Sequence, residues 1–235
     1  PSWTTFGLNT VGSGFDRIDQ ENTWRLDYVV EQAERLGLRV MLCIDSFNII
    51  RSTKNRYGCF ETGPYHPDQG GPVAKSSDYF THPAMLKAYR DRLRHLVARY
   101  GHSPAVFAWE FWNEVDIIDN YDGNVVRPWH TEMSRFLRTI DPWNHLITTS
   151  TANHRGKPRL DAIREIEFVQ THHYQAKDMA ADLLNDLRTK RAARDRPHFH
   201  GEFCISHSGA DTARMDPGSV HLHNALYASV TQGAA

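Results

Sequence analysis

Amphipathic helical patterns alternate with short apolar runs along most of the chain, and this alternation constrains the fold more than any other feature. The helical pattern Asn22–Gly37 is followed at once by the run Leu38–Ile44, which predicts a strand buried on both faces. Strands that alternate with helices in this way are typical of a parallel sheet covered by helices. The same patterns predict helices over Pro83–Tyr100, Pro128–Ile140, Met179–Arg191 and Ser219–Gln232, and strands over Ala105–Phe111, His145–Ser150, Ile166–His172 and His198–Cys204.

Five predicted strands are compatible with a doubly wound sheet or with a closed barrel, and two features favour the barrel. No glycine-rich phosphate-binding fingerprint follows any predicted strand, and polar residues gather just past the strand ends. We therefore expect residues 1–235 to form a single partial catalytic domain of the (β/α)8 type. A complete barrel typically has about 250 residues, and we interpret the chain as the middle of one, with both ends cut.

The charges nearly cancel, with 27 basic and 28 acidic residues. This balance excludes the broad basic surface that nucleic acids and anionic membranes require. No apolar run approaches the roughly 18 residues of a membrane span, and no signal-peptide pattern opens the chain. We therefore expect neither nucleic acid nor a membrane as a partner, and the sequence leaves the oligomeric state open. The three cysteines are too few and too scattered for a disulfide framework or a zinc site.

Two glutamates lie at the C-terminal ends of predicted strands, at the rim where barrels of this kind carry out their chemistry. Glu114 ends the segment AVFAWEFWNE, and Glu202 lies in HFHGEFC. Cleavage of a glycosidic bond with retention needs a carboxylic acid that protonates the leaving oxygen and a carboxylate that attacks the sugar carbon. The two groups stand roughly 5–5.5 Å apart. A single strand-end glutamate is more often structural, but two in these positions form a candidate catalytic pair.

The neighbours of the two glutamates support this interpretation. Asn113 can donate a hydrogen bond to a sugar 2-hydroxyl, and Gly201 removes a side chain where substrate or backbone must come close. A buried Glu110 would need a partner, for which an arginine on a missing strand is a candidate. Strand alternation places Glu110, Trp112 and Glu114 on one face of their strand. It likewise places His198, His200 and Glu202 on one face of theirs.

These motifs, in this order, resemble the clan of (β/α)8 retaining glycoside hydrolases, and within it a cellulase-like member of the family five type. The segment WEFWNEVD comes first, THHY follows it, and GEF comes last. The resemblance covers nearly the whole chain. It implies that Pro1–Phe6 is the tail of strand two, and that strand one, most of strand two and strand eight are missing.

The resemblance also implies roles for individual residues. Glu114 matches the acid/base and Glu202 the nucleophile, while Asn113 matches the residue that binds the 2-hydroxyl. His172 and Tyr174 match a pair in which the tyrosine hydrogen-bonds the nucleophile and the histidine lines the sugar-binding cleft. The implied enzyme hydrolyses β-glycosidic bonds of a β-glucan or mannan type carbohydrate by double displacement, without a cofactor, and is secreted or periplasmic in a bacterium.

Further substrate-binding candidates lie beside these motifs. Many relatives end strand three in a histidine, whereas this chain has MLCIDSFN, and we include its Asn48. Trp112 and Trp3 are the first candidates for stacking on sugar rings, although core packing is the alternative for each. Tyr174 and His200 are candidates for keeping Glu202 ionised by hydrogen bonding. The other aromatic candidates are Phe47, Tyr57 and Tyr65.

Two other functions stay open at this point. Fourteen histidines raise the alternative of a metal-dependent barrel hydrolase, but no aspartate follows at a strand end to complete a ligand set, and we expect no metal. A carbohydrate-binding barrel without turnover is the second alternative, and the presence of both glutamates argues against it. The histidine pairs considered are His172 with His173, His198 with His200, and His221 with His223.

Overall fold

The computed structural model describes residues 7–193 and 196–234. Its strands are β1 (Val40–Ser46), β2 (Val106–Asn113), β3 (Leu146–Thr148), β4 (Ser150–Thr151), β5 (Val169–Tyr174) and β6 (His198–Cys204). Its α-helices are α1 (Gln20–Leu36), α2 (Pro83–Tyr100), α3 (Gly123–Ile140), α4 (Pro158–Asp161), α5 (Met179–Ala193), α6 (Gly209–Met215) and α7 (Val220–Thr231). The expected strand end at Pro1–Phe6, which includes Trp3, lies outside the described residues.

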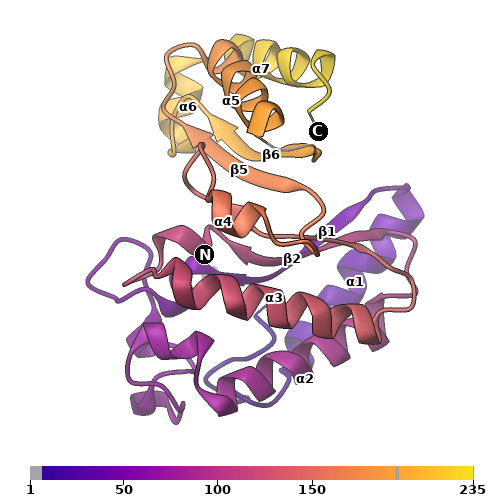
Figure 1. Ribbon diagram of the computed structural model, residues 1–235, viewed down its shortest axis with the longest axis vertical. Helices are drawn as coiled ribbons and strands as arrows, with labels where there is room; N and C mark the ends of the chain where they lie inside the picture. Colours follow the sequence, from indigo (N-terminus) through magenta and orange to yellow (C-terminus); the bar gives the residue numbers. More distant parts are fainter. Residues whose placement is uncertain (1–6, 194–195, 235) are drawn as a thin grey trace.

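All paired strands are parallel and follow one another in chain order, as a barrel requires. One sheet has the order β1-β2-β3 and the other the order β4-β5-β6. The predicted strand His145–Ser150 is divided, because β3 pairs with β2 while β4 pairs with β5, and Thr149 lies between them. All five predicted strands are thus confirmed. Figure 1 shows α5 and α7 packed over β5 and β6 at one end of the molecule, with α1, α2 and α3 at the other.

Local capping explains where the helices begin and end. Asp19 caps α1 by accepting a hydrogen bond from the amide of Asn22, and Gly37 ends the helix in the left-handed region at φ 66°. Helix α2 has the predicted bounds, with Pro83 in its first turn. Helix α3 begins at Gly123, before the predicted Pro128, because Asp122 caps it there.

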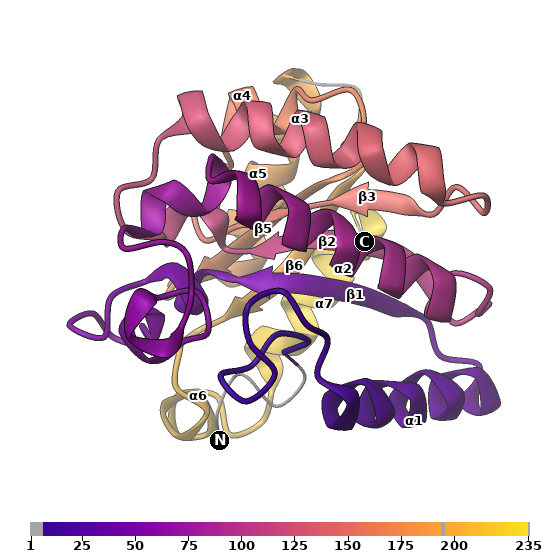
Figure 2. The same ribbon diagram turned by 90° about the horizontal axis from the view of Figure 1, so that it is seen from below.

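Aromatic side chains fill the core between the first sheet and the helices α2 and α3, which run side by side along it (Figure 2). Trp109, Phe111 and Tyr89 are fully buried in this core. The region Asp45–His82, predicted as a long loop, contributes to it through Tyr79 and Phe80. This region holds four short 3-10 helices, at Phe47–Ile50, Phe60–Thr62, Pro67–Gln69 and Ser76–Phe80.

A buried ion pair fastens that region to the sheet. The guanidinium of Arg92 on α2 donates to both carboxylate oxygens of Asp45 at the end of β1, over 2.9 and 2.7 Å. The hydroxyl of Tyr79 donates to the same carboxylate over 2.6 Å, and the guanidinium also donates to the hydroxyl of Tyr65. Asp45 and Tyr65 therefore have structural roles. No helix among the described residues is long and apolar enough to cross a bilayer.

Candidate active site

The two predicted catalytic glutamates lie at the carboxyl ends of β2 and β6. Glu114 comes directly after β2, in the left-handed region at φ 53°, and its amide donates to the hydroxyl of Ser150 over 2.9 Å. A non-glycine residue in this region is strained and needs support from its surroundings. Since Glu114 lies past the end of the strand, this turn rather than strand alternation sets its direction.

A single imidazole bridges the glutamates. Nδ1 of His172, on β5 between the two glutamate-bearing strands, lies 2.9 Å from Oε1 of Glu114 and 3.5 Å from Oε2 of Glu202. The three side-chain atoms lie within 4.8 Å of one another. The structure therefore brings together three of the predicted site residues, from positions far apart in the sequence.

The charge of His172 follows from these neighbours. Burial of the ring lowers the pKa of His172, but the hydrogen bond with Glu114 and the charges of Glu202 and Glu114 outweigh it, so the pKa is raised above its ordinary value. When both glutamates are ionised, they thus favour the protonated ring. The side chain of Glu202, at 42% exposed, is more open than that of Glu114, at 13%.

Tyr174 contacts the second glutamate as predicted. Its hydroxyl donates to Oε2 of Glu202 over 2.6 Å. Burial and the bond to Glu202 raise the pKa of Tyr174, so the phenol keeps its proton and can donate. The ring of His207 stacks on Tyr174 with a centroid distance of 4.4 Å.

The prediction that His200 also holds Glu202 is wrong. In the register of β5 and β6, Thr171 pairs with His200 and His172 with Glu202, so Gly201 is an extra residue in β6. Such a bulge breaks the alternation that was expected to turn both side chains the same way. The His200 ring instead packs on His198, and burial lowers the pKa of His200 to about 4.

Glu110 has a partner on a neighbouring strand. The side-chain amide of Gln170 on β5 donates to Oε1 of Glu110 over 2.8 Å, so the expected arginine is replaced by a glutamine. Gly201 makes room for this amide, because a Cβ at position 201 would lie 2.8 Å from Nε2 of Gln170. Burial raises the pKa of Glu110 to about 7.

Glu110→Gln is expected to remove a pH dependence of stability. A carboxyl with a higher pKa in the folded state than in the unfolded state binds its proton more tightly when folded, so stability falls as pH rises from about 5 toward 8. Relative to the variant, the free energy of unfolding of the wild type should fall by about 2–3 kcal/mol over this interval. Urea denaturation at about pH 5 and pH 8 measures this change. The same change in the free energy of unfolding for the wild type and the variant would contradict the prediction.

The remaining predicted residues divide into two groups. Asn113 and Asn48 line the cleft with the glutamates. Nδ2 of Asn113 donates a hydrogen bond to the hydroxyl of Ser46. Oδ1 of Asn48 is buried and has no hydrogen-bond partner among the described residues. Trp112 is 0% exposed and packs on the rings of Tyr79, Phe80 and Trp129. The prediction that Trp112 stacks on sugar is therefore wrong, since the aromatic core encloses it.

The cleft that Asn113 and Asn48 line with the glutamates has a volume of about 640 Å³. The predicted aromatic residues Phe47 and Tyr57 line it, and the guanidinium groups of Arg51 and Arg56 lie over their rings at 5.6 and 4.5 Å. Neither arginine was predicted as a site residue, although both lie in the region Asp45–His82, which is unusually long for a loop in a compact domain. His154 and His207, which line the same cleft, were not predicted either.

Two groups of side chains among the described residues could hold a metal ion: Glu114, His172 and Glu202, and His154, His173 and Asp186. Neither the pair His198–His200 nor the pair His221–His223 gains a third ligand within residues 7–193 and 196–234.

Comparison with solved structures identifies the class of fold. The chain is similar to an endo-1,4-β-D-mannanase from Thermotoga petrophila, with a TM-score of 0.64 and 19% identity, over 89% of this chain and 66% of that one. It is also similar to endo-glycoceramidase II from a Rhodococcus species, with a TM-score of 0.65 and 15% identity, over 97% and 62%. Strands β1 to β6 with their helices thus form an arc of a (β/α)8 barrel, as predicted.

The chain belongs to the cellulase family, glycosyl hydrolase family 5, whose sequence model matches residues 3–226. The probable mannan endo-1,4-β-mannosidase A-2 of Aspergillus terreus is 35% identical over 143 residues, which are 61% of this chain and 32% of that protein. The mannan endo-1,4-β-mannosidase A of Aspergillus aculeatus is 30% identical over 142 residues, or 60% and 33%. The chain thus spans about a third of the length of these relatives.

Proposed function

We propose that the chain carries the catalytic pair of a retaining glycoside hydrolase, with Glu114 as acid/base and Glu202 as nucleophile. The separation of the two carboxylates carries this proposal. Oxygens of the two carboxylates approach within 4.8 Å of one another, which is compatible with the roughly 5–5.5 Å of retaining enzymes and short of the roughly 6.5–9.5 Å of inverting ones.

The reaction proceeds in two displacements. Glu202 attacks the anomeric carbon while Glu114 protonates the glycosidic oxygen, so the bond from that carbon to the leaving sugar breaks as the bond to the enzyme forms. Glu114, now ionised, takes a proton from water, which attacks the same carbon and releases Glu202. Two inversions give a product with the original configuration.

Three neighbours assist the pair. Tyr174 donates to Glu202 and stabilises its charged form. The imidazole of His172 contacts both carboxylates and fixes their separation. Asn113, at the end of the strand that precedes Glu114, is placed to bind the 2-hydroxyl of the sugar.

The substrate class that we propose is a β-mannan, with β-glucan as the second candidate. Relatives at 35% and 30% identity are named mannan endo-1,4-β-mannosidases. The rings of Phe47 and Tyr57 offer apolar faces to sugars along the cleft. A polymer of this kind favours a secreted or periplasmic location, which stays a prediction.

Hydrolysis of mannan, β-glucan, xylan and aryl β-glycosides by the wild type, Glu114→Gln and Glu202→Gln tests the proposal. Glu31→Gln, on the exposed surface of α1, is the matched control. We expect activity in the wild type and the control that both cleft variants lose. Sugar binding without hydrolysis in the wild type would instead support a carbohydrate-binding barrel without turnover.

Tyr174→Phe is expected to lower kcat/KM by about tenfold to 100-fold, because a hydrogen bond to a charged group contributes about 1.5–3 kcal/mol. Steady-state kinetics with an aryl β-mannoside measure the loss. Tyr28→Phe, on exposed α1, removes the same atom without touching the cleft. Equal kinetics for the two variants would contradict a role of Tyr174 in holding Glu202.

A further inference from the structure

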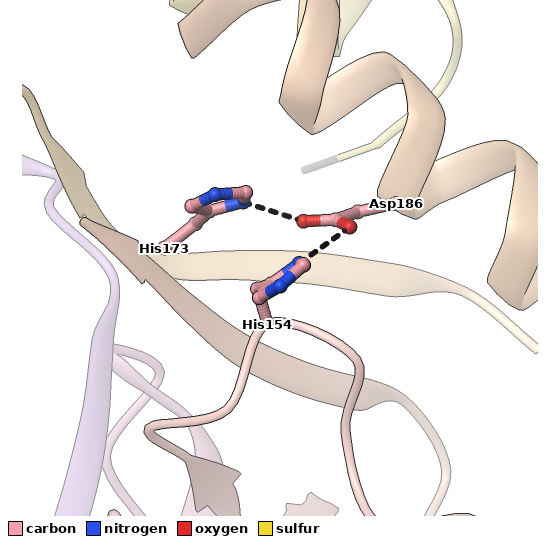
Figure 3. A group of neighbouring side chains, drawn as sticks. All are labelled: His154, His173 and Asp186. Carbon is pink, nitrogen blue, oxygen red and sulfur yellow. Dashed lines mark hydrogen bonds and ion pairs between the residues drawn. The ribbon is translucent and has the colours of Figure 1, made fainter. Parts of the chain in front are cut away.

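Three side chains that the proposed reaction does not use converge beside the cleft (Figure 3). His154 comes from the segment between β4 and α4, His173 from β5 and Asp186 from α5. Nδ1 of His154 lies 2.8 Å from one carboxylate oxygen of Asp186, and Nδ1 of His173 lies 2.6 Å from the other. The three side-chain atoms all lie within 4.8 Å of one another.

Asp186 is a buried acid whose direct partners are imidazoles, and the ammonium of Lys190 acts on it only from a greater distance. Asp186 is 5% exposed, and its ion pairs among the described residues are with the two imidazoles and with no lysine or arginine. Burial raises the pKa of Asp186, but the hydrogen bonds of His173 and His154 outweigh it and keep the pKa below its ordinary value. The oxygens of Asp186 and the nitrogens of both rings are close enough to share one ion.

We propose that His154, His173 and Asp186 bind a divalent transition metal ion of the zinc class. Two imidazole nitrogens and one carboxylate oxygen are a donor set that zinc takes with a fourth position open, whereas calcium and magnesium prefer oxygen ligands alone. His154 and His173 both line the cleft, so the fourth position is open to solvent or to a ligand there.

Binding requires the two hydrogen bonds to Asp186 to be exchanged for bonds to the ion. Metal–ligand distances of about 2.0–2.2 Å in a tetrahedral site place ligand atoms about 3.3 Å apart. The nitrogen–oxygen distances of 2.8 and 2.6 Å end on different oxygens of Asp186, so both would lengthen on binding, the carboxylate would present one oxygen or both to the ion, and each imidazole would give up the proton on Nδ1. The two rings already face each other, with a centroid distance of 4.2 Å and an angle of 34° between their planes.

This site differs from the catalytic pair, although the chain connects them. His173 lies between His172 and Tyr174 in sequence, and successive side chains of a strand point to opposite sides. The ion would thus lie to the other side of the strand end that carries both catalytic neighbours, at the edge of the cleft that His154 and His173 line. The site is independent of the proposed hydrolysis, because none of its ligands takes part in the two displacements.

Zn²⁺ binding to the full chain tests the proposal, measured by equilibrium dialysis with metal analysis. The variants are Asp186→Asn and His154→Gln, with the exposed His223→Gln as the histidine control. Glu202→Gln disables the second group that could hold a metal. We expect one Zn²⁺ per chain in the wild type, His223→Gln and Glu202→Gln, and binding weakened at least tenfold in Asp186→Asn and His154→Gln.

Co²⁺ titration of the wild type adds a measurement that needs no variant to fold. Intense visible absorption bands of tetrahedral Co²⁺, abolished by added Zn²⁺, would support the site. Absence of saturable binding to the wild type would overturn it and leave a hydrogen-bonded histidine–aspartate cluster. Binding that Glu202→Gln removes and Asp186→Asn preserves would also overturn it, because the ion would then lie on the catalytic pair.

Discussion

Replacement of Glu202 by alanine is expected to lower kcat/KM on aryl β-mannosides by about 10⁴-fold or more, and added azide should restore part of the turnover. Loss of a nucleophile costs up to about 10⁶-fold in well-studied hydrolases. The vacated space lets azide reach the anomeric carbon from the face that the carboxylate occupied, while Glu114 still protonates the leaving oxygen. The product should therefore be an α-glycosyl azide, which NMR identifies.

Glu114→Ala is the matched comparison, because azide should then give the opposite anomer. With an activated leaving group, Glu202 can still form the covalent intermediate, and azide attacks it from the other face to give a β-glycosyl azide. If the two variants gave each other's products, the roles of Glu114 and Glu202 would be reversed. Full activity of Glu202→Ala without azide would contradict the nucleophile assignment outright.

Arg92→Met is expected to destabilise the fold by about 3–5 kcal/mol, because it leaves the buried carboxylate of Asp45 without its cation. Both side chains of this pair are only 3% exposed. At about 2–4 °C per kcal/mol for a chain of this size, the melting temperature should fall by about 10 °C. Thermal unfolding followed by circular dichroism measures the change.

Arg94→Met provides the control on the same helix. Arg94 pairs with Asp91 at the surface, and exposed pairs contribute about 0–1 kcal/mol. Combining Arg92→Met with Asp45→Leu should recover part of the stability, since the unpaired buried charge is then removed. Equal melting temperatures for Arg92→Met and Arg94→Met would contradict the role assigned to the buried pair.

The sequence was sufficient to predict the barrel and the residues that meet at its rim. The periodicity of strands and the signals that begin and end helices are read from residues adjacent in sequence. For this reason α2 and β6 were predicted with their observed bounds. The positions of Glu114, Glu202, His172 and Tyr174 followed from the ordered motifs, because parallel strands present their carboxyl ends at one rim.

Features that depend on pairing between distant segments could not be predicted. The bulge at Gly201 appears only when β6 is set against β5, and it reverses the expectation for His200. The burial of Trp112 depends on Tyr79, which arrives from a region predicted as loop. An acidic partner for the histidines was expected at a strand end. Asp186, the partner of His173, lies on helix α5 and was therefore not predicted.

The interruption at Thr149 places the two catalytic glutamates on different sheets. Glu114 follows the sheet β1-β2-β3, whereas Glu202 belongs to the sheet β4-β5-β6. Ser150 on β4 connects the two sheets. Its hydroxyl accepts a hydrogen bond from the backbone amide of Glu114 and donates one to Oδ1 of Asn113. The distance between the acid and the nucleophile therefore depends on how the two sheets are joined at this point, and not on the geometry of either sheet alone.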